Sequence, residues 1–313
     1  MAAPDPGRMH PPRTDAADVL RAETPERVLH RLEWKVIRRL DGLLQGGYLT
    51  AFRGIGTDFL DLREYEAGDD VRHIDWNVTA RMDTPFVRQY SEDRELTAWL
   101  LLDRSRSMGF GPTDRPKELV LCELAATFAR LLTRGGNRVG AILFDSEIEE
   151  TLPPRNSRNQ VLALIRNLLR PPRARGALTD LTGLLETAAG AIRRRSLVIL
   201  ISDFIVAPGW ERPLLRLTER HEVVAIRLLD PREYELPDAG VIVVEDLETG
   251  EQLVVDSSDA GFRHRLREAG EHREAELRAA TLRAGADICE VSTADDLVAA
   301  LVRIVETRTR RRR

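Results

Sequence analysis

The sequence has few of the residues that mark secreted or membrane-spanning proteins. Among its 313 residues only Cys122 and Cys289 are cysteines, and they lie far apart in apolar surroundings. This spacing excludes a disulfide framework and a CxxC zinc site, so we expect two reduced thiols in the core. No apolar run approaches the roughly 20 residues that cross a bilayer, and the N-terminus has no apolar signal region. These absences predict a cytoplasmic protein with no transmembrane segment.

The sequence is also poor in the features of nucleic-acid-binding proteins and nucleotide-dependent enzymes. The formal net charge is -4, and 5% of the residues are aromatic. Nucleic-acid binding favours a basic surplus and stacking rings, so we expect no nucleic-acid partner. GxxxxGK[ST] and GxSxG are both absent, which argues against a P-loop and a hydrolase nucleophile elbow. We interpret the arginine-rich residues 308–313 as a solvated basic tail, with binding to an acidic partner or an anionic surface as the alternative.

What the chain does contain is a change of pattern along its length. Residues 1–23, rich in proline, arginine and aspartate, predict a disordered lead. Residues 24–95 predict an N-terminal helix followed by a small β-rich segment. Over 96–307, apolar strands alternate with helices, and a hairpin is expected near 240–256, around a Glu-Thr-Gly turn. This alternation predicts an α/β fold: a doubly wound, mainly parallel sheet with helices on both faces.

Two of the most apolar strands end on an acid. LLL runs into Asp103 and VILIS runs into Asp203. In a doubly wound sheet the functional crevice lies beyond the carboxyl ends of the strands, where the strand order reverses. If the two strands are neighbours at that point, their carboxylates repel each other unless a cation lies between them.

The residues around Asp103 indicate which cation would fit. Ser105 and Ser107 follow Asp103 at alternate positions, and Thr179 or Thr182 would add a third hydroxyl from a later loop. These are hard oxygen ligands without a nearby His or Cys, a set that favours Mg²⁺ over zinc, with Mn²⁺ or Ca²⁺ as alternatives. Any single one of these residues is also typical of a helix N-cap.

This Asp-x-Ser-x-Ser pattern, with a later threonine and aspartate, resembles the metal-ion-dependent adhesion site of von Willebrand factor A-type domains. Threonine in that family stands just before an acid and an apolar residue, as Thr179 does here. A glycine commonly follows the last acid, whereas this chain has Phe204. The resemblance implies a metal site made by Asp103, Ser105, Ser107, Thr179 and Asp203.

The preceding segment, RGIGTDFLDLREYEAGDDVRHIDWNVTARMDTPFVRQYSEDRE, resembles a bacterial family of uncharacterised domains that carries the number fifty-eight. The resemblance runs from about Leu40 to about Arg308, and Arg72-x-x-Asp75-Trp76 through Ala80-Arg81 is its most specific part. That family often occurs alongside MoxR-type AAA+ ATPases. The resemblance therefore implies an adaptor or chaperone-like partner of such an ATPase.

The same motif admits two interpretations. His73 beside Asp75 and Trp76 is compatible with general-base chemistry. We favour a packing corner on an extended segment, where Arg72, Asp75 and Arg81 pair while Trp76 covers the core. Arg72 or Arg81 would then also be available to dock a partner's acid or to restrain the metal loop.

We therefore expect a metal-dependent protein–protein interaction module and not an enzyme. A client or ATPase would offer an Asp or Glu to an open position on the ion. The alternative is a metal-dependent phosphoryl hydrolase with Asp103 as nucleophile. Such an enzyme needs a proton-transfer group two positions later, and this chain has Ser105 there.

Overall fold

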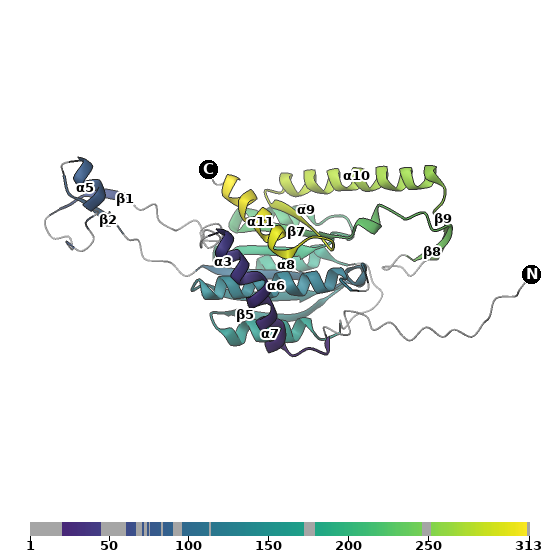
Figure 1. Cartoon of the computed structure of the whole chain (residues 1–313), viewed down its shortest axis with the longest axis horizontal. Helices are drawn as coiled ribbons and strands as arrows, with labels where there is room; N and C mark the ends of the chain where they lie inside the picture. Colours follow the sequence, from purple (N-terminus) through teal and green to yellow (C-terminus); the bar gives the residue numbers. More distant parts are fainter. Residues whose placement is uncertain are drawn as a thin grey trace, which may run out of the picture. The chain divides into compact units, whose positions relative to one another are not determined.

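The chain folds into two compact units, drawn in Figure 1. The smaller unit is Arg53–Leu96, and the larger combines Met1–Phe52 with Thr97–Arg313. The computed structural model describes residues 21–44, 61–66, 71, 74, 76–82, 84–89, 96–112, 114–171, 179–245 and 252–311. Among these residues no helix is both long and apolar enough to cross a membrane.

The larger unit contains a six-stranded sheet in the order β10-β7-β6-β3-β4-β5. The first five strands in this order run parallel, and β5 pairs antiparallel with β4 at the edge. The central strands are continuous apolar runs because both of their faces are buried. The strands are β3 (Thr97–Asp103), β4 (Arg138–Phe144), β5 (Ile148–Arg155), β6 (Leu197–Ser202), β7 (Glu222–Leu229) and β10 (Asp287–Ser292).

The strand order reverses between β3 and β6. From β3 the chain moves outward to β4 and β5, and then returns to the other side of β3 to form β6, β7 and β10. The two strands are hydrogen-bonded neighbours in parallel register, with Leu102 opposite Ile201. Asp103 is the last residue of β3, and Asp203 directly follows β6. Both therefore lie at the carboxyl edge of the sheet at the switch point, where α/β proteins place their ligands.

Helices cover both faces of the sheet, so the predicted doubly wound α/β fold is confirmed. The helices α6 and α7 pack on one face, and α8, α9 and α10 pack on the other (Figure 1). The helix α11 packs on β10 beside α3. Their bounds are α6 (Lys117–Arg134), α7 (Arg158–Leu168), α8 (Leu181–Ala191), α9 (Glu211–Arg220), α10 (Ala260–Arg283) and α11 (Leu297–Arg311).

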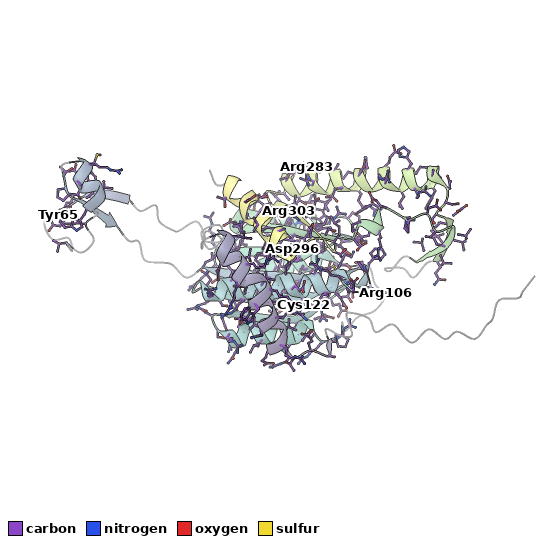
Figure 2. All side chains as sticks on the ribbon, in the orientation of Figure 1. Tyr65, Arg106, Cys122, Arg283, Asp296 and Arg303 are labelled. Atoms are coloured by element: carbon purple, nitrogen blue, oxygen red, sulfur yellow. The ribbon has the colours of Figure 1, made fainter. Side chains whose placement is uncertain are left out.

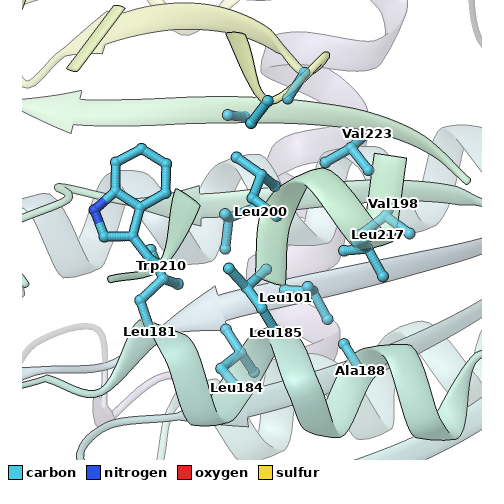
Figure 3. Packing of buried hydrophobic residues seen from close by; sticks show 14 of the residues in the cluster. Leu101, Leu181, Leu184, Leu185, Ala188, Val198, Leu200, Trp210, Leu217 and Val223 are labelled. Carbon is cyan, nitrogen blue, oxygen red and sulfur yellow. The ribbon is translucent and has the colours of Figure 1, made fainter. Parts of the chain in front are cut away.

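The apolar core beneath α8 and α9 anchors the start of α8 at the carboxyl edge. Alternate residues of the strands, such as Leu101 and Leu200, meet Leu181 and Leu185 of α8 (Figure 3). Trp210, which precedes α9, packs in the same cluster. Burying a leucine side chain contributes about 1.5–3 kcal/mol, so this layer holds the loops at the carboxyl edge in place.

The N-terminal helical segment belongs to the larger unit. It comprises α2 (Pro25–Leu32), the π-helical turn η1 (Glu33–Ile37) and α3 (Arg38–Leu44), and Thr24 caps its start by accepting a hydrogen bond from the Arg27 amide. Its apolar side packs on α6, α7 and α11. The expected grouping of this helix with the β-rich segment over 24–95 is therefore wrong, because the apolar side of the helix packs on helices of the larger unit.

The C-terminus also differs from the expected solvated tail. α11 continues to Arg311, and the Arg308 side chain is buried and paired with Glu222. The tail expected from residue 308 is thus largely the last turn of a packed helix, and residues 312 and 313 lie outside the described part. Of the lead expected over 1–23, only residues 21–23 are described, and Arg21 pairs there with Glu118 at 3.0 Å.

The smaller unit has a two-stranded antiparallel sheet and a short helix among its described residues. β1 (Asp61–Glu64) pairs with β2 (Phe86–Gln89), and α5 (Trp76–Met82) is tied to β2 by the Phe86 amide, which donates to the Thr79 hydroxyl at 3.1 Å. The expectation of an extended segment at Trp76 is therefore wrong, since this residue begins a helix.

A second antiparallel hairpin lies in the larger unit after the short turn η4 (Pro231–Glu233). Its strands are β8 (Val241–Glu245) and β9 (Gln252–Asp256), and they stand apart from the six-stranded sheet near the start of α10 (Figure 1).

Candidate metal centre

Asp103 is fully buried at the end of β3, and both of its carboxylate oxygens accept hydrogen bonds. The Ser105 amide donates to Oδ1 at 2.8 Å, and the Ser202 hydroxyl donates to Oδ2 at 2.5 Å. Burial, and then the nearby charge of Asp203, raise the pKa of Asp103 to about 7, although the bonds from Ser202 and Ser105 act in the opposite direction. The two acids at the ends of the neighbouring strands are thus close enough to interact electrostatically.

The two serines after Asp103 bring their hydroxyls together. Ser105 and Ser107 are both buried, and their Oγ atoms are 3.0 Å apart. Ser105 makes no capping bond to the following turn η3 (Arg106–Gly109), so the N-cap interpretation does not hold for its side chain.

The intervening Arg104 explains the alternate spacing of these oxygens. Its guanidinium pairs with Glu149 at 2.7 Å, donates to the Arg170 carbonyl, and is buried. Arg106 is exposed at the same edge (Figure 2). Asp103, Ser105 and Ser107 therefore supply the buried side-chain oxygens of this loop, whereas the two arginine side chains are directed elsewhere.

Thr179 and Thr182, the two candidates for the third hydroxyl, occupy different positions. Thr179 precedes α8 at the carboxyl edge and is fully buried, and its Oγ1 has no hydrogen-bond partner among the described residues. Thr182 is half-buried inside α8. Asp180 between them caps the helix by accepting a bond from the Gly183 amide at 3.1 Å. An unpaired buried hydroxyl is costly, so Thr179 is the better candidate of the two for a metal ligand.

Asp203 is buried and has a cationic neighbour that the sequence did not reveal. The Lys117 ammonium, at the start of α6, donates to Asp203 Oδ2 at 2.6 Å and to Glu233 Oε1 at 2.5 Å. Burial alone would lower the pKa of Lys117, but the charges of Asp203 and Glu233 outweigh it and raise this pKa above its usual value. Lys117 therefore stays charged between the two acids.

A signal for Lys117 exists in the composition. Among the 47 Lys and Arg residues of the chain, only Lys35 and Lys117 are lysines. A lysine ammonium is a compact point charge that fits between two carboxylates, whereas the planar guanidinium needs a wider space. A lysine in a chain whose other cations are nearly all arginine thus indicates a position where arginine does not fit.

Phe204, which follows Asp203, has a backbone conformation that favours glycine. Its backbone φ is 58°, in the left-handed region that residues other than glycine rarely adopt. The Phe204 amide donates to the Ser202 hydroxyl at 2.9 Å, and its ring packs edge-on against Trp210 with centroids 5.7 Å apart. Packing and hydrogen bonding therefore offset the strain of this backbone conformation.

The upstream motif does not form a described site. Arg72, His73 and Asp75 lie outside the described residues. Trp76 is 68% exposed and Arg81 is exposed, both in α5. The pairing of Arg72, Asp75 and Arg81 and the covering of the core by Trp76 stay predictions.

The residues at the carboxyl edge fit a hexacoordinate oxygen-binding cation. Mg²⁺ holds oxygens at about 2.0–2.1 Å in octahedral geometry, which separates neighbouring ligands by about 2.9 Å. The Ser105 and Ser107 hydroxyls are 3.0 Å apart. Asp103, Asp203 and Glu233 also outnumber the single charge of Lys117, so the group would accept added positive charge. No cluster of three or more His, Cys, Asp or Glu suited to a metal occurs in the described part of the chain.

Comparison with known proteins gives a family match over most of the chain. The family described as "Protein of unknown function DUF58" matches residues 61–276. The uncharacterised protein Mb1516 of Mycobacterium bovis is 36% identical over 309 residues, covering 97% of this chain and 96% of the relative.

Solved structures with related topology are more distant. The conserved hypothetical protein BatB from Bacteroides thetaiotaomicron is 16% identical, with a TM-score of 0.42, over 69% of this chain and 98% of that chain. A von Willebrand factor type A protein from Catenulispora acidiphila is 12% identical, with a TM-score of 0.39, over 69% and 42%. At these TM-scores the fold is assigned from the strand order of this chain and not from its similarity to the solved structures.

Proposed function

Since the chain belongs to the family described as "Protein of unknown function DUF58", we propose that it is a metal-dependent protein–protein interaction module. When bound, Mg²⁺ would supply an open coordination position to a carboxylate from another protein. The residues that would hold the ion are Asp103, Ser105, Ser107, Thr179 and Asp203.

The observation that carries this proposal is the Thr179 hydroxyl. It is fully buried, and no described residue hydrogen-bonds it. Leaving such a group unpaired costs about 1–3 kcal/mol, so the position is unfavourable unless the oxygen has a ligand. The paired serines are compatible with the same site: their hydroxyls hydrogen-bond each other at 3.0 Å, so two further buried oxygens already lie side by side.

The chemistry of the ligands favours capture of an acidic partner. Three of the five ligands are neutral hydroxyls, so only Asp103 and Asp203 offset the charge of the cation, and an Asp or Glu from a partner could still bind it directly at an open position. The resemblance of the upstream segment supports a MoxR-type AAA+ ATPase as the partner or as the enzyme that acts on a shared client. We propose the role of an adaptor on this basis.

Hydrolysis is supported less well by the same geometry. An Asp103 nucleophile would need a proton-transfer group two positions later along the chain. The position two residues later is Ser105, a poor proton donor at neutral pH. We therefore propose binding and not catalysis.

The direct test compares Thr179→Val with the control Thr182→Val. Valine keeps the shape of threonine but removes the hydroxyl. In EDTA, Thr179→Val is expected to be at least as stable as wild type, because an unpaired hydroxyl has been removed. Saturating Mg²⁺ should stabilise wild type and Thr182→Val in urea unfolding, by about 2.7 kcal/mol at 100 times the dissociation constant. Equal Mg²⁺ stabilisation of Thr179→Val would contradict the site.

Partner binding is tested separately. A purified MoxR-type ATPase is expected to be retained by the immobilised chain in Mg²⁺ and released by EDTA, and Asp103→Ala should not retain it. Retention that survives EDTA would remove the ion from the interaction. Turnover of p-nitrophenyl phosphate that depends on Mg²⁺ and is lost in Asp103→Ala would instead favour the hydrolase.

A further inference from the structure

The β8–β9 hairpin exposes apolar side chains that the fold does not cover. Val241, Val243 and Val254 are 70%, 62% and 73% exposed, and Leu253 is 58% exposed. Elsewhere among the described residues, exposed large apolar side chains are scattered over several elements. Val241, Val243 and Val254 share one face of this small sheet and form a patch of the kind that marks an interaction surface, and Leu253 is exposed on the other face.

The hairpin is held firmly at its base. The Ser257 side chain is buried, accepts a bond from the Ala239 amide at 3.0 Å and donates to the Gly240 carbonyl at 2.8 Å. Arg263 in the first turn of α10 donates to the Ser257 carbonyl and lies 3.8 Å from Asp238. The strands are thus presented from a fixed base and do not need to be ordered on binding, which lowers the cost of association.

The register defines a two-sided element with open edges. Val243 stands opposite Val254, and Ile242 stands opposite Val255 on the other face. Among the described residues the sheet has only these two strands, so each strand has one edge without a strand neighbour. Natural proteins usually protect such edges with lysine, proline or a covering element. Residues 241–256 contain neither lysine nor proline.

The charge of this segment selects among possible occupants. The two described strands contain two acids, Glu245 and Asp256, and no Lys, Arg or His. A second copy of the hairpin would bring like charges together, and an anionic lipid surface would be repelled in the same way. A segment with lysine or arginine around an apolar centre is complementary.

We propose that the β8–β9 hairpin docks an extended, basic and apolar segment of a partner protein by strand addition. The backbone of the segment would pair with an open edge, and its apolar residues would cover the valines. Glu245 ends β8 and Asp256 ends β9, so basic residues at both ends of a short apolar stretch match the acids. This surface is independent of the metal centre and of the function proposed above.

The probe for this test is a peptide with the core Lys-Val-Val-Val-Lys, flanked by glycine and serine and carrying a fluorophore. Its counterpart has Glu-Val-Val-Val-Glu. Binding to the full chain is measured by fluorescence anisotropy, in EDTA and at low salt. The double variant Val243→Thr with Val254→Thr removes apolar surface while keeping β-propensity, and Leu282→Gln, at an exposed leucine of α10, is the matched control.

The lysine peptide is expected to bind wild type and Leu282→Gln alike, at least about tenfold more tightly than the double variant or the glutamate peptide. Equal binding of the two peptides would overturn the proposed charge selection, and unchanged binding to the double variant would overturn the surface. Dimerisation of wild type that the double variant loses would instead identify a second copy as the occupant and overturn the proposal. Since the assay contains EDTA, its result does not depend on the metal centre.

Discussion

Replacing Lys117 by methionine is expected to be among the most destabilising single changes at the carboxyl edge. The substitution removes the ammonium but keeps an unbranched side chain of similar length in the core. Asp203 and Glu233, which bind Lys117 at 2.6 and 2.5 Å, would lose their shared cation. Removing one partner of a buried ion pair costs about 3–5 kcal/mol, because the remaining charge is left buried and uncompensated.

Urea unfolding in EDTA, followed by tryptophan fluorescence, measures this loss. The matched control is Arg39→Met, which breaks the exposed pair between Arg39 and Asp296 at 3.3 Å. An exposed pair contributes about 0–1 kcal/mol, so the control should remain close to wild type. If Lys117→Met lost no more than the control, the two acids would have to be solvated or otherwise neutralised, and the account of Lys117 as their counter-ion would be refuted.

Three further substitutions test other parts of the structure. Phe204→Gly should be more stable than Phe204→Ala by about 1 kcal/mol, although both lose the ring, because only glycine relieves the positive φ; a more stable alanine variant would disprove the strain. Burial, followed by the charges of two neighbouring arginines, lowers the pKa of His221. The contribution of neutral His221 to stability is therefore full above about pH 6.5 and is lost as the pH falls toward the lowered pKa. His221→Phe should reduce the loss of stability in acid, whereas the exposed control His264→Gln should not. Gly140→Ala should cost about 1–3 kcal/mol in urea unfolding, since its Cβ would lie 2.9 Å from the Trp99 ring; wild-type stability would show that the ring can move away.

Much of the sheet follows from local patterns in the sequence. The alternation of apolar strands and helices predicts the doubly wound fold, since strands buried on both faces must be nearly all apolar. Acids that interrupt two such runs predict the switch point, because a carboxylate is tolerated only where a buried strand ends at a crevice. The pairing of Leu102 with Ile201 agrees with that expectation.

The location of the N-terminal helix was harder to predict from the sequence. Val28, Leu29 and Leu32 predict an amphipathic helix, but an apolar face does not specify which surface will cover it. Its proximity along the chain to the β-rich segment suggested one common region, whereas the larger apolar surface of α6 and α7 offers more burial.

The candidate site was predicted only where its residues are contiguous. Asp103, Ser105 and Ser107 share one loop, so their spacing carries information. Lys117 comes from the opposite end of a long loop, at the start of a helix whose periodic pattern describes only its apolar residues. The strained φ of Phe204 was also inaccessible, because it results from the Ser202 bond and the contact with Trp210, and not from local preference.

The larger unit is built from two separate stretches of the chain, and this arrangement has a practical consequence for the design of fragments. A fragment that starts at Thr97 would keep β3 and everything after it, yet it would remove α2 and leave the apolar surfaces of α6 and α7 open to water. Fragments for biochemistry should instead retain residues from Arg21 onward and replace Arg53–Leu96 by a short flexible connector. Such an excision removes the smaller unit while it keeps the N-terminal helices that pack on α6 and α7.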